Sequence, residues 1–265
     1  MEKTPTRRLE GLWLTIVGWA VLIFLILPTL IVIPMSFSGA SYLEFPPSSF
    51  SLRWYEAYFG SDVWMSATWT SLLAAILTTA IATPLGTLCA YGLYCSSARI
   101  QKAGQLLVIL PIVIPVILIG VGVFNIYARI GLNYTLAGVV LAHTAMALPF
   151  VIITVLSGLY NHDLSQELAA RSLGASRAYA FWTVTVPQVR FSIQTGAFLA
   201  FITSLDEVVI SMLVSGGENA TVTRRMFNSL RDQIDPTIAA ISTCLITVSV
   251  LALVAVQFLG GKKDS

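Results

Sequence analysis

The chain has 265 residues, of which 56% are hydrophobic and only 11% are charged, and its formal net charge is +2. A soluble domain carries about 25% charged residues, so this composition excludes a water-soluble globular fold. It also excludes a disordered chain, which has few apolar residues, and a nucleic-acid binder, which needs a basic face. The sequence therefore predicts an all-α integral membrane protein.

Six stretches are apolar and long enough to cross a bilayer as helices, because about 20 apolar residues span its hydrocarbon core. The second stretch is longer than a span requires, so we expect it to be tilted or to extend beyond the membrane. The first is too long for the apolar region of a signal peptide, which has about 7–15 residues, and is interpreted as a transmembrane helix. The six predicted spans are Leu12–Ile33, Val63–Tyr94, Ala103–Tyr127, Leu136–Tyr160, Phe191–Leu213 and Thr237–Leu259.

The distribution of lysine and arginine predicts the orientation, because cytoplasmic loops are enriched in these residues. The chain has 15 of them, and a cytoplasmic N-terminus places ten inside and five outside. We therefore expect both termini in the cytoplasm. Residues 161–190 then form the longest cytoplasmic loop of a single membrane domain that covers residues 1–265.

The pattern of this loop predicts two short helices. Asp163 and Gln166 have the spacing of a capping box, so a helix is expected to begin at Asp163. Gly174 is placed to end it with a positive φ, and Ser176 is placed to cap a second helix. The first helix carries an apolar stripe at helical spacing, and this stripe needs a protein partner or, as the alternative, the surface of the inner leaflet. The stripe consists of Leu164, Leu168, Ala169 and Leu173.

The stretch AARSLGAS and the later run TVTVP, in a chain with six predicted spans, resemble the EAA loop of ABC-importer permeases. Ala169, Ala170 and Gly174 match the alanines and the glycine of that motif. Its glutamate position falls on Leu168, and Glu167 lies one residue earlier. The resemblance implies the type I ABC-importer permease fold, in which the first short helix is a coupling helix seated in a groove of a cytoplasmic ATPase subunit. The implied coupling residues are Asp163, Leu164, Glu167, Leu168, Ala169, Ala170, Leu173 and Gly174.

The fifth predicted span contains two adjacent acids, Asp206 and Glu207. An acid at the membrane centre costs about 3 kcal/mol and usually faces a bundle interior or a cavity. The pair is interpreted either as a cation-attracting site or gate in a translocation path, or as a structural pair bonded to neighbouring helices. Asn125 and His143 are further polar groups at membrane depth, and they either line the path or bond neighbouring helices. The candidates for the path are Asp206, Glu207, Ser204 and Asn125.

The run from Ser204 to Glu207 resembles the S-F-D-E element of permeases in the spermidine/putrescine importer branch. Residues 224–246 look like the outer loop and the sixth span of the same branch, although its usual T-L-P is absent before the outer loop. The resemblance implies translocation of a small cationic solute across the bacterial inner membrane, with a polyamine such as spermidine or putrescine favoured. Importers of iron, phosphonates, opines and small amino compounds share parts of this signature and remain alternatives.

No G-x-x-x-x-G-K-[ST] motif occurs in the chain, so it cannot cradle ATP phosphates itself. The resemblance implies a transport subunit, not an enzyme, with ATP and Mg²⁺ bound by a separate pair of cytoplasmic ATPase subunits. A second permease subunit, for which the resemblance favours a different chain, and an extracytoplasmic substrate-binding protein complete the expected assembly. The outer-loop residues either dock the binding protein or are solvated: Arg224, Arg225, Arg231 and Asp232.

Two other classes of protein, a secondary transporter and a membrane enzyme, are alternatives. A secondary transporter would use Asp206 or Glu207 as its coupling acid, but such folds commonly show inverted repeats, and no clear repeat is present. A membrane enzyme would need a metal-ligand cluster, and the chain has only two histidines, His143 and His162. We therefore expect no metal or cofactor on this chain. The cysteines match neither a disulfide framework nor a zinc site: Cys89, Cys95 and Cys244.

Overall fold

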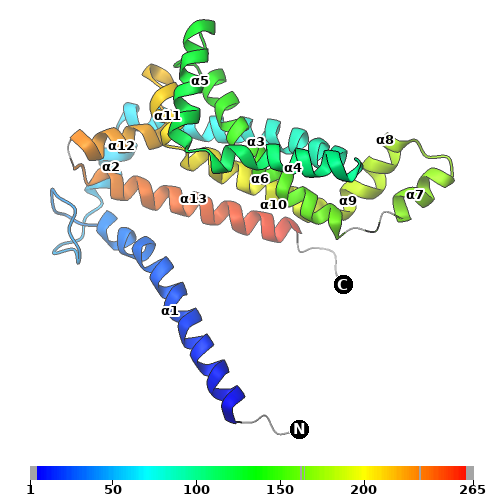
Figure 1. Cartoon of the computed structure of the whole chain (residues 1–265). Helices are drawn as coiled ribbons and strands as arrows, with labels where there is room; N and C mark the ends of the chain where they lie inside the picture. The colour runs from blue at the N-terminus through cyan, green and yellow to red at the C-terminus, as the bar shows by residue number, and fades with distance from the viewer. Residues whose placement is uncertain (1–4, 162, 164, 233, 261–265) are drawn as a thin grey trace. The chain divides into compact units, whose positions relative to one another are not determined.

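The computed structural model describes residues 5–161, 163, 165–232 and 234–260. They belong to two compact units, one made of Met1–Ser61 with Ser229–Thr247 and the other of Asp62–Asn228 with Val248–Ser265 (Figure 1). The α-helices are α1 (Pro5–Ser36), α2 (Arg53–Phe59), α3 (Asp62–Tyr94), α4 (Ala98–Val113), α5 (Val116–Ile130), α6 (Leu136–Tyr160), α7 (Ser165–Ser172), α8 (Arg177–Ala180), α9 (Val186–Gln188), α10 (Arg190–Asp206), α11 (Val209–Val214), α12 (Val222–Asp232) and α13 (Thr237–Gly260), with a π-helical turn η1 (Phe181–Thr185) and a 3₁₀ turn η2 (Gly217–Asn219).

The first unit contains α1, α2 and a loop between them that folds back on itself. Gly39 donates its backbone N–H to the carbonyl oxygen of Ser49 at 2.9 Å. The hydroxyl groups of Ser36 and Tyr55 lie 2.7 Å apart, which connects the last residue of α1 to α2. These bonds satisfy polar groups that a disordered loop would leave to solvent.

Four described helices are long and apolar enough to cross a membrane: α1 from Trp13, α3, α6 and α13 up to Phe258. The bent pair α4 and α5 raises this number to five if the pair is one span. The fourth predicted span coincides with α6, and the second and sixth begin within about one residue of α3 and α13. The all-α membrane class is therefore confirmed, and the number of six spans stays a prediction.

The third predicted span is bent. α4 and α5 meet at 94° across a short break. Ile114 has φ −70° and ψ 133°, the extended conformation favoured before proline. Pro115 follows and has no N–H with which to continue the helical hydrogen bonds. The Ile114–Pro115 dipeptide therefore explains why this span is not one straight helix.

The fifth predicted span is divided into α10 and α11, which have 17 and 6 residues. Glu207, at the break, has φ −70° and ψ 110°, so the backbone is extended there. Neither part alone is long enough to cross the bilayer core, which needs about 20 residues. Because of this break, the fifth predicted span is not one continuous helix that is long enough to cross the membrane.

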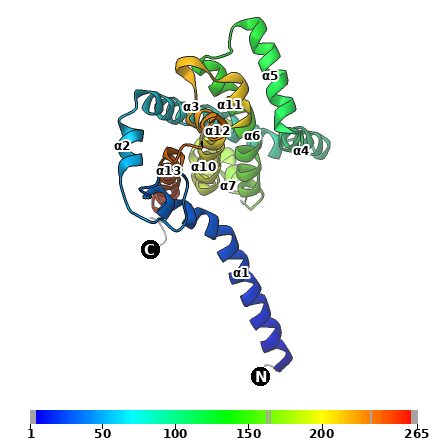
Figure 2. The same cartoon turned by 90° about the vertical axis from the view of Figure 1, so that its left-hand side faces the viewer.

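The second unit is built around the contact of α6 with α3 and α10, which Figure 2 shows grouped together. Val151 of α6 is fully buried. A Cβ atom added to Gly86 of α3 would lie 2.6 Å from its Cγ1, and one added to Gly196 of α10 would lie 3.2 Å from its Cα. Small residues at such positions let membrane helices approach closely. The two glycines thus allow α6 to pack between its neighbours.

Gly86→Ala is predicted to destabilise the protein, because the new methyl group would overlap Val151. Overpacking of this kind costs about 1–3 kcal/mol. The matched control is Gly92→Ala on the same helix, since a Cβ at Gly92 meets nothing within 4 Å. Thermal unfolding in detergent measures both variants. An unfolding temperature for Gly86→Ala equal to that of Gly92→Ala would contradict the close-packing argument.

Candidate functional site

The loop between α6 and α10 contains short helices, of which α7 and α8 correspond to the two that the sequence predicts. The carboxylate of Asp163 accepts hydrogen bonds from the backbone N–H of Ser165 at 2.9 Å and from its hydroxyl at 2.7 Å, at the start of α7. Gly174 follows α7 with φ +96°, in the left-handed region. Ser176 caps α8 by accepting the N–H of Tyr179 at 3.2 Å. The predicted capping box is wrong: α7 begins at Ser165, two residues after the expected start, and the side-chain oxygen of Gln166 accepts a hydrogen bond from Gln188. The positive φ of Gly174 and the cap at Ser176 are as predicted, and Leu164 lies outside the described residues.

The apolar side chains of α7 are exposed in the isolated chain. Leu168 is 55% exposed, and Leu173, just beyond the helix, is 90% exposed. Ala169 is also exposed, and Ala170 is half-buried. Because large exposed apolar side chains next to one another favour a partner, this face of α7 is available for docking.

The opposite side of α7 is held by a buried carboxylate. Glu167 is only 3% exposed. Its two oxygens accept hydrogen bonds from the hydroxyl of Tyr91 on α3 and from that of Thr185 on η1, each at 2.6 Å. A carboxylate with two short bonds of this kind is a strong attachment. Glu167 therefore connects α7 to the end of α3 and to the segment that leads into α10.

Arg177 lies beside this attachment. Its guanidinium carbon is 5.4 Å from the ring centroid of Tyr91, and its Nε is 3.4 Å from the Tyr91 hydroxyl. The hydrogen bond to Tyr91 holds the pKa of Arg177 above its ordinary value. The guanidinium group therefore stays positively charged against the ring and the hydroxyl of Tyr91.

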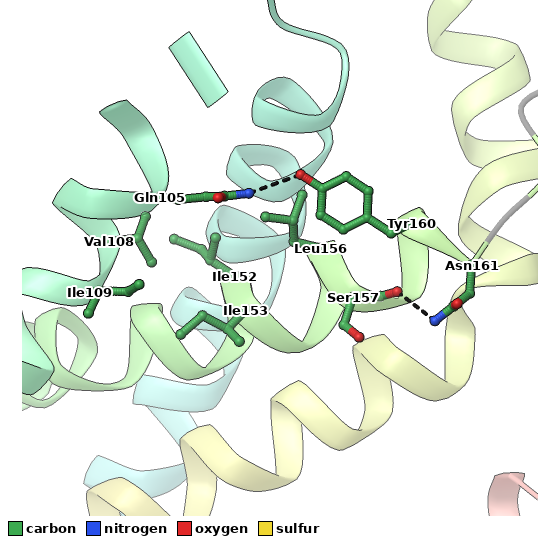
Figure 3. Close-up of a pocket in the computed structure, with 9 residues that line it drawn as sticks. All are labelled: Gln105, Val108, Ile109, Ile152, Ile153, Leu156, Ser157, Tyr160 and Asn161. Atoms are coloured by element: carbon green, nitrogen blue, oxygen red, sulfur yellow. Dashed lines mark hydrogen bonds between the residues drawn. The ribbon is translucent and has the colours of Figure 1, made fainter. Parts of the chain in front are cut away.

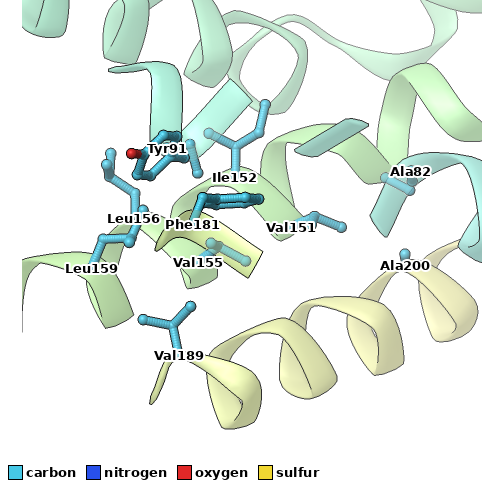
Figure 4. Close-up of a cluster of buried hydrophobic side chains, with 12 residues drawn as sticks. Ala82, Tyr91, Val151, Ile152, Val155, Leu156, Leu159, Phe181, Val189 and Ala200 are labelled. Atoms are coloured by element: carbon cyan, nitrogen blue, oxygen red, sulfur yellow. The ribbon is translucent and has the colours of Figure 1, made fainter. Parts of the chain in front are cut away.

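A cluster of buried apolar side chains fixes the loop to the helices beneath it (Figure 4). The ring of Phe181 in η1 lies 4.5 Å from that of Tyr91, measured between centroids. Phe181 and Val189 are 4% exposed, and Leu159 of α6 is 1% exposed. The loop and the ends of α3 and α6 therefore form one packed body, so a displacement of α7 reaches both helices.

The sequence identified Glu167 as a coupling residue but did not predict that it is buried. Its partner Tyr91 lies 76 positions earlier, and nothing in the local pattern distinguishes that tyrosine from others at the ends of spans. The other partner, Thr185, belongs to the TVTVP run of the EAA-like loop. Its position in that run is the one feature of the sequence that could have pointed to its contact with Glu167.

The second candidate site is the break between α10 and α11, where the two acids differ. Glu207 is half-buried, and its Oε1 accepts the backbone N–H of Ile210 at 2.9 Å, which caps α11. Its carbonyl oxygen accepts the hydroxyl of Thr223 at 3.0 Å. Asp206 is exposed at the end of α10 and has no hydrogen bond or ion pair to another residue in the described ranges. Asp206 is thus the acid that is free to meet a ligand.

His143 of α6 bridges the two sides of the break. The ring is 1% exposed. Its Nδ1 lies 2.8 Å from the hydroxyl of Ser204 on α10, and its Nε2 lies 3.1 Å from the hydroxyl of Ser211 on α11. Bonds between helices are one of the two roles expected for this histidine. They satisfy the buried polar side chains beside the break and connect α6 to the helices on both sides of it.

The two remaining candidates for the translocation path, Ser204 and Asn125, lie in different surroundings. Ser204 is 3% exposed and lies in the helix bundle, bonded to His143. Asn125 is exposed on α5, and its side chain donates to the carbonyl oxygen of Val121 in the same helix at 2.9 Å. The structure therefore brings Ser204 and Glu207 together at the break and leaves Asn125 on a separate helix surface.

A largely apolar pocket of about 480 Å³ lies between α4 and α6 (Figure 3). Gln105 closes part of it by donating its side-chain amide to the hydroxyl of Tyr160 at 2.9 Å. None of the predicted site residues lines this pocket. No group of three His, Cys, Asp or Glu side chains that could hold a metal ion occurs among the residues that the structure describes. The lining residues are Gln105, Val108, Ile109, Ile152, Ile153, Leu156, Ser157, Tyr160 and Asn161.

Comparison with known proteins gives a consistent result. The family model described as "binding-protein-dependent transport system inner membrane component" matches residues 82–263. The spermidine/putrescine transport system permease protein PotC of Haemophilus influenzae is 29% identical over 242 residues, which is 91% of this chain and 93% of the relative. The putrescine transport system permease protein PotI of Escherichia coli K12 is 29% identical over 240 residues, which is 88% of this chain and 85% of the relative.

The fold is also similar to a solved structure. A chain of the bacterial alginate ABC transporter, in complex with an alginate pentasaccharide-bound periplasmic protein, matches with a TM-score of 0.68. The match covers 97% of this chain and 96% of that chain at 18% sequence identity. At this identity the likeness concerns the fold, which is that of an ABC-transporter membrane subunit.

Tyr91→Phe is predicted to loosen α7, because Glu167 loses one of its two described donors. Loss of a buried hydrogen bond to a charged group costs about 1–3 kcal/mol. Limited trypsin digestion measures the effect, with faster cleavage expected after Arg171. Tyr179→Phe is the matched control, since Tyr179 lies on the same loop and is 63% exposed. Equal cleavage rates in the two variants would show that the bond to Glu167 does not hold the helix.

Proposed function

The chain belongs to the family of binding-protein-dependent transport system inner membrane components, and from that premise we propose that it carries a polyamine through the bacterial inner membrane. It is a permease subunit of an ABC importer and not an enzyme. The observation that carries the substrate proposal is its similarity, over about nine-tenths of its length, to permeases named for spermidine/putrescine and putrescine transport.

The geometry at the break in the fifth span suits a cationic solute. α10 ends at Asp206, and the carbonyl groups of a helix C-terminus carry a partial negative charge. The exposed carboxylate of Asp206 adds a full negative charge at the same place. A polyamine carries several positive charges on a flexible apolar stem, so such a site would attract it. Glu207 is engaged as the cap of α11, and we assign it the role of holding the break open, with Ser204 supporting it through His143.

Transport would be driven from the loop between α6 and α10. We assign the exposed face of α7, with Leu168, Ala169 and nearby Leu173, to a groove on an ATPase subunit. ATP and Mg²⁺ would be bound by a pair of these ATPases, whose closure would move α7. Because Glu167 is bonded to Tyr91 and Thr185, that movement would reach α3 and α10. The remaining coupling residues, Asp163, Ala170 and Gly174, would fix the ends and the contact face of this lever.

The assembly would contain two permease subunits, two ATPases and an extracytoplasmic binding protein. The similarity to PotC and PotI supports a different chain as the second permease. Both termini would lie in the cytoplasm, because that orientation places most lysine and arginine residues inside. The two compact units would work together as one permease domain.

The test of this proposal is ATP-driven uptake by the purified assembly. The chain is extracted mildly with its partners, reconstituted into vesicles with its binding protein, and supplied with radiolabelled spermidine or putrescine. We expect uptake that requires ATP and Mg²⁺ on the ATPase side. Uptake driven by an ion gradient without ATP would identify a secondary transporter. ATP-driven uptake of an anionic or neutral solute in place of a polyamine would contradict the substrate proposal alone.

Asp206→Asn is predicted to lower polyamine uptake by at least about tenfold, because a charged hydrogen bond contributes about 1.5–3 kcal/mol. Glu207→Gln is the matched control, since its amide oxygen still accepts the N–H of Ile210. It should change uptake less than about threefold. Initial uptake rates at equal amounts of assembled transporter measure both. A larger loss of uptake in Glu207→Gln than in Asp206→Asn would assign the cation-binding role to Glu207 and contradict the role proposed for Asp206.

A further inference from the structure

A small polar pocket lies between η2 and the first turns of α12, within the second unit. Its volume is about 270 Å³. Two arginine side chains, from adjacent positions, line it together with glycine backbone. The lining contains no acidic side chain. The lining residues are Gly216, Gly217, Ala220, Arg224, Arg225 and Asn228.

The arginines of this pocket have donors without acceptors. Nη1 of Arg224 and Nε of Arg225 are buried and make no hydrogen bond in the described structure. Nη2 of Arg225 reaches the carbonyl oxygen of Gly217 at 3.5 Å, which is long for a hydrogen bond. A buried charged donor without an acceptor is costly. The two guanidinium groups therefore have capacity for an anion that the surrounding residues do not supply.

The backbone around the pocket is fixed, so the site is formed before any ligand arrives. Val222 donates its N–H to the hydroxyl of Ser71 on α3 at 2.8 Å. Thr221 accepts the N–H of Arg224 at 3.3 Å. A Cβ atom at Gly216 would lie 2.9 Å from Nη1 of Arg224, so a larger residue there would displace the guanidinium group. Glycine at this position thus keeps the arginine against the backbone.

The pocket lies at the opposite end of the second unit from the coupling loop. On α3, Ser71 bonds the pocket segment and Tyr91 bonds Glu167 of the loop. About 20 helical residues separate them, which corresponds to about 30 Å, the thickness of the bilayer core. Figure 1 likewise shows α11 and α7 at opposite ends of α6 and α10. With the loop on the cytoplasmic side, the pocket faces the extracytoplasmic side.

We propose that this two-arginine pocket is a docking site for a carboxylate side chain of the extracytoplasmic binding protein. This inference rests on the proposed function. The two positive charges of the pocket would repel a polyamine, so the pocket is not a binding site for the transported solute. The family depends on binding proteins, and these reach the permease from this side. A guanidinium group binds a carboxylate through paired hydrogen bonds, and the volume suits one acidic side chain.

The first test is a zero-length cross-link. Arg224→Lys and Arg225→Lys each place an amine at the pocket, and a carbodiimide joins an amine only to a carboxylate in direct contact. The full assembly is mixed with substrate-loaded binding protein, treated with carbodiimide and analysed by mass spectrometry. We expect a cross-link from at least one of these variants to an Asp or Glu of the binding protein. Arg231→Lys, on the same helix, is the control and should give none.

The second test measures the affinity of the assembly for the binding protein and does not depend on cross-linking. The binding-protein concentration that half-maximally stimulates ATP hydrolysis should rise by at least about tenfold in Arg225→Gln, with the maximal rate unchanged. Arg231→Gln should change it less than about threefold. Higher salt should weaken docking of the parent more than that of Arg225→Gln, because salt screens charge pairs.

The outcomes separate this inference from the function on which it rests. A parent assembly that the binding protein does not stimulate would overturn the proposed function. A parent that is stimulated, with no cross-link and with equal effects of Arg225→Gln and Arg231→Gln, would overturn the docking site alone. A loss of affinity seen only in vesicles of anionic lipid, without any cross-link, would assign the pocket to a lipid phosphate and overturn the proposal as well.

Discussion

The close contact of α6 with α3 and α10 around Val151 is the constraint on which the second unit depends. Gly86 and Gly196 allow it, because larger residues would meet the valine at 2.6 and 3.2 Å. Each of the three helices then carries part of a candidate site. α3 brings Tyr91 to the loop between α6 and α10, α6 brings His143 to the break, and α10 ends at Asp206. The two sites are therefore parts of one packed body and not separate attachments to it.

Three carboxylates in this body have three different surroundings, and these surroundings determine what each can do. Glu167 is buried and accepts two short hydrogen bonds, so it attaches α7 to α3 and to η1. Glu207 is half-buried and caps α11. Asp206 is exposed, so among the three it alone is free to attract a mobile cation. A charge in a membrane protein is retained for attachment, for capping or for transport according to the donors around it.

Charge of opposite sign lies close to the break between α10 and α11, because Thr223, the neighbour of Arg224, donates its hydroxyl to the carbonyl oxygen of Glu207 at 3.0 Å. Arg224 and Arg225 carry buried donors without acceptors on the side away from the coupling loop. The proposed cation path beside Asp206 and the proposed docking pocket beside the two arginines would select ligands of opposite charge, so cargo and docking protein would not compete for one site. Coupling between the ends would pass through α3, whose hydrogen bonds involve Ser71 at one end and Tyr91 at the other.

The sequence by itself determined the membrane class, the family, the bounds of the fourth span, and the positive φ at Gly174 that follows α7. These depend on composition, apolar length and local capping, which are properties of neighbouring residues. The tertiary structure decided the division of the fifth span, the separate roles of Asp206 and Glu207, and the burial of Glu167 against Tyr91. These depend on hydrogen bonds between residues far apart in the chain, and no local pattern specifies which distant donor will meet a given acid.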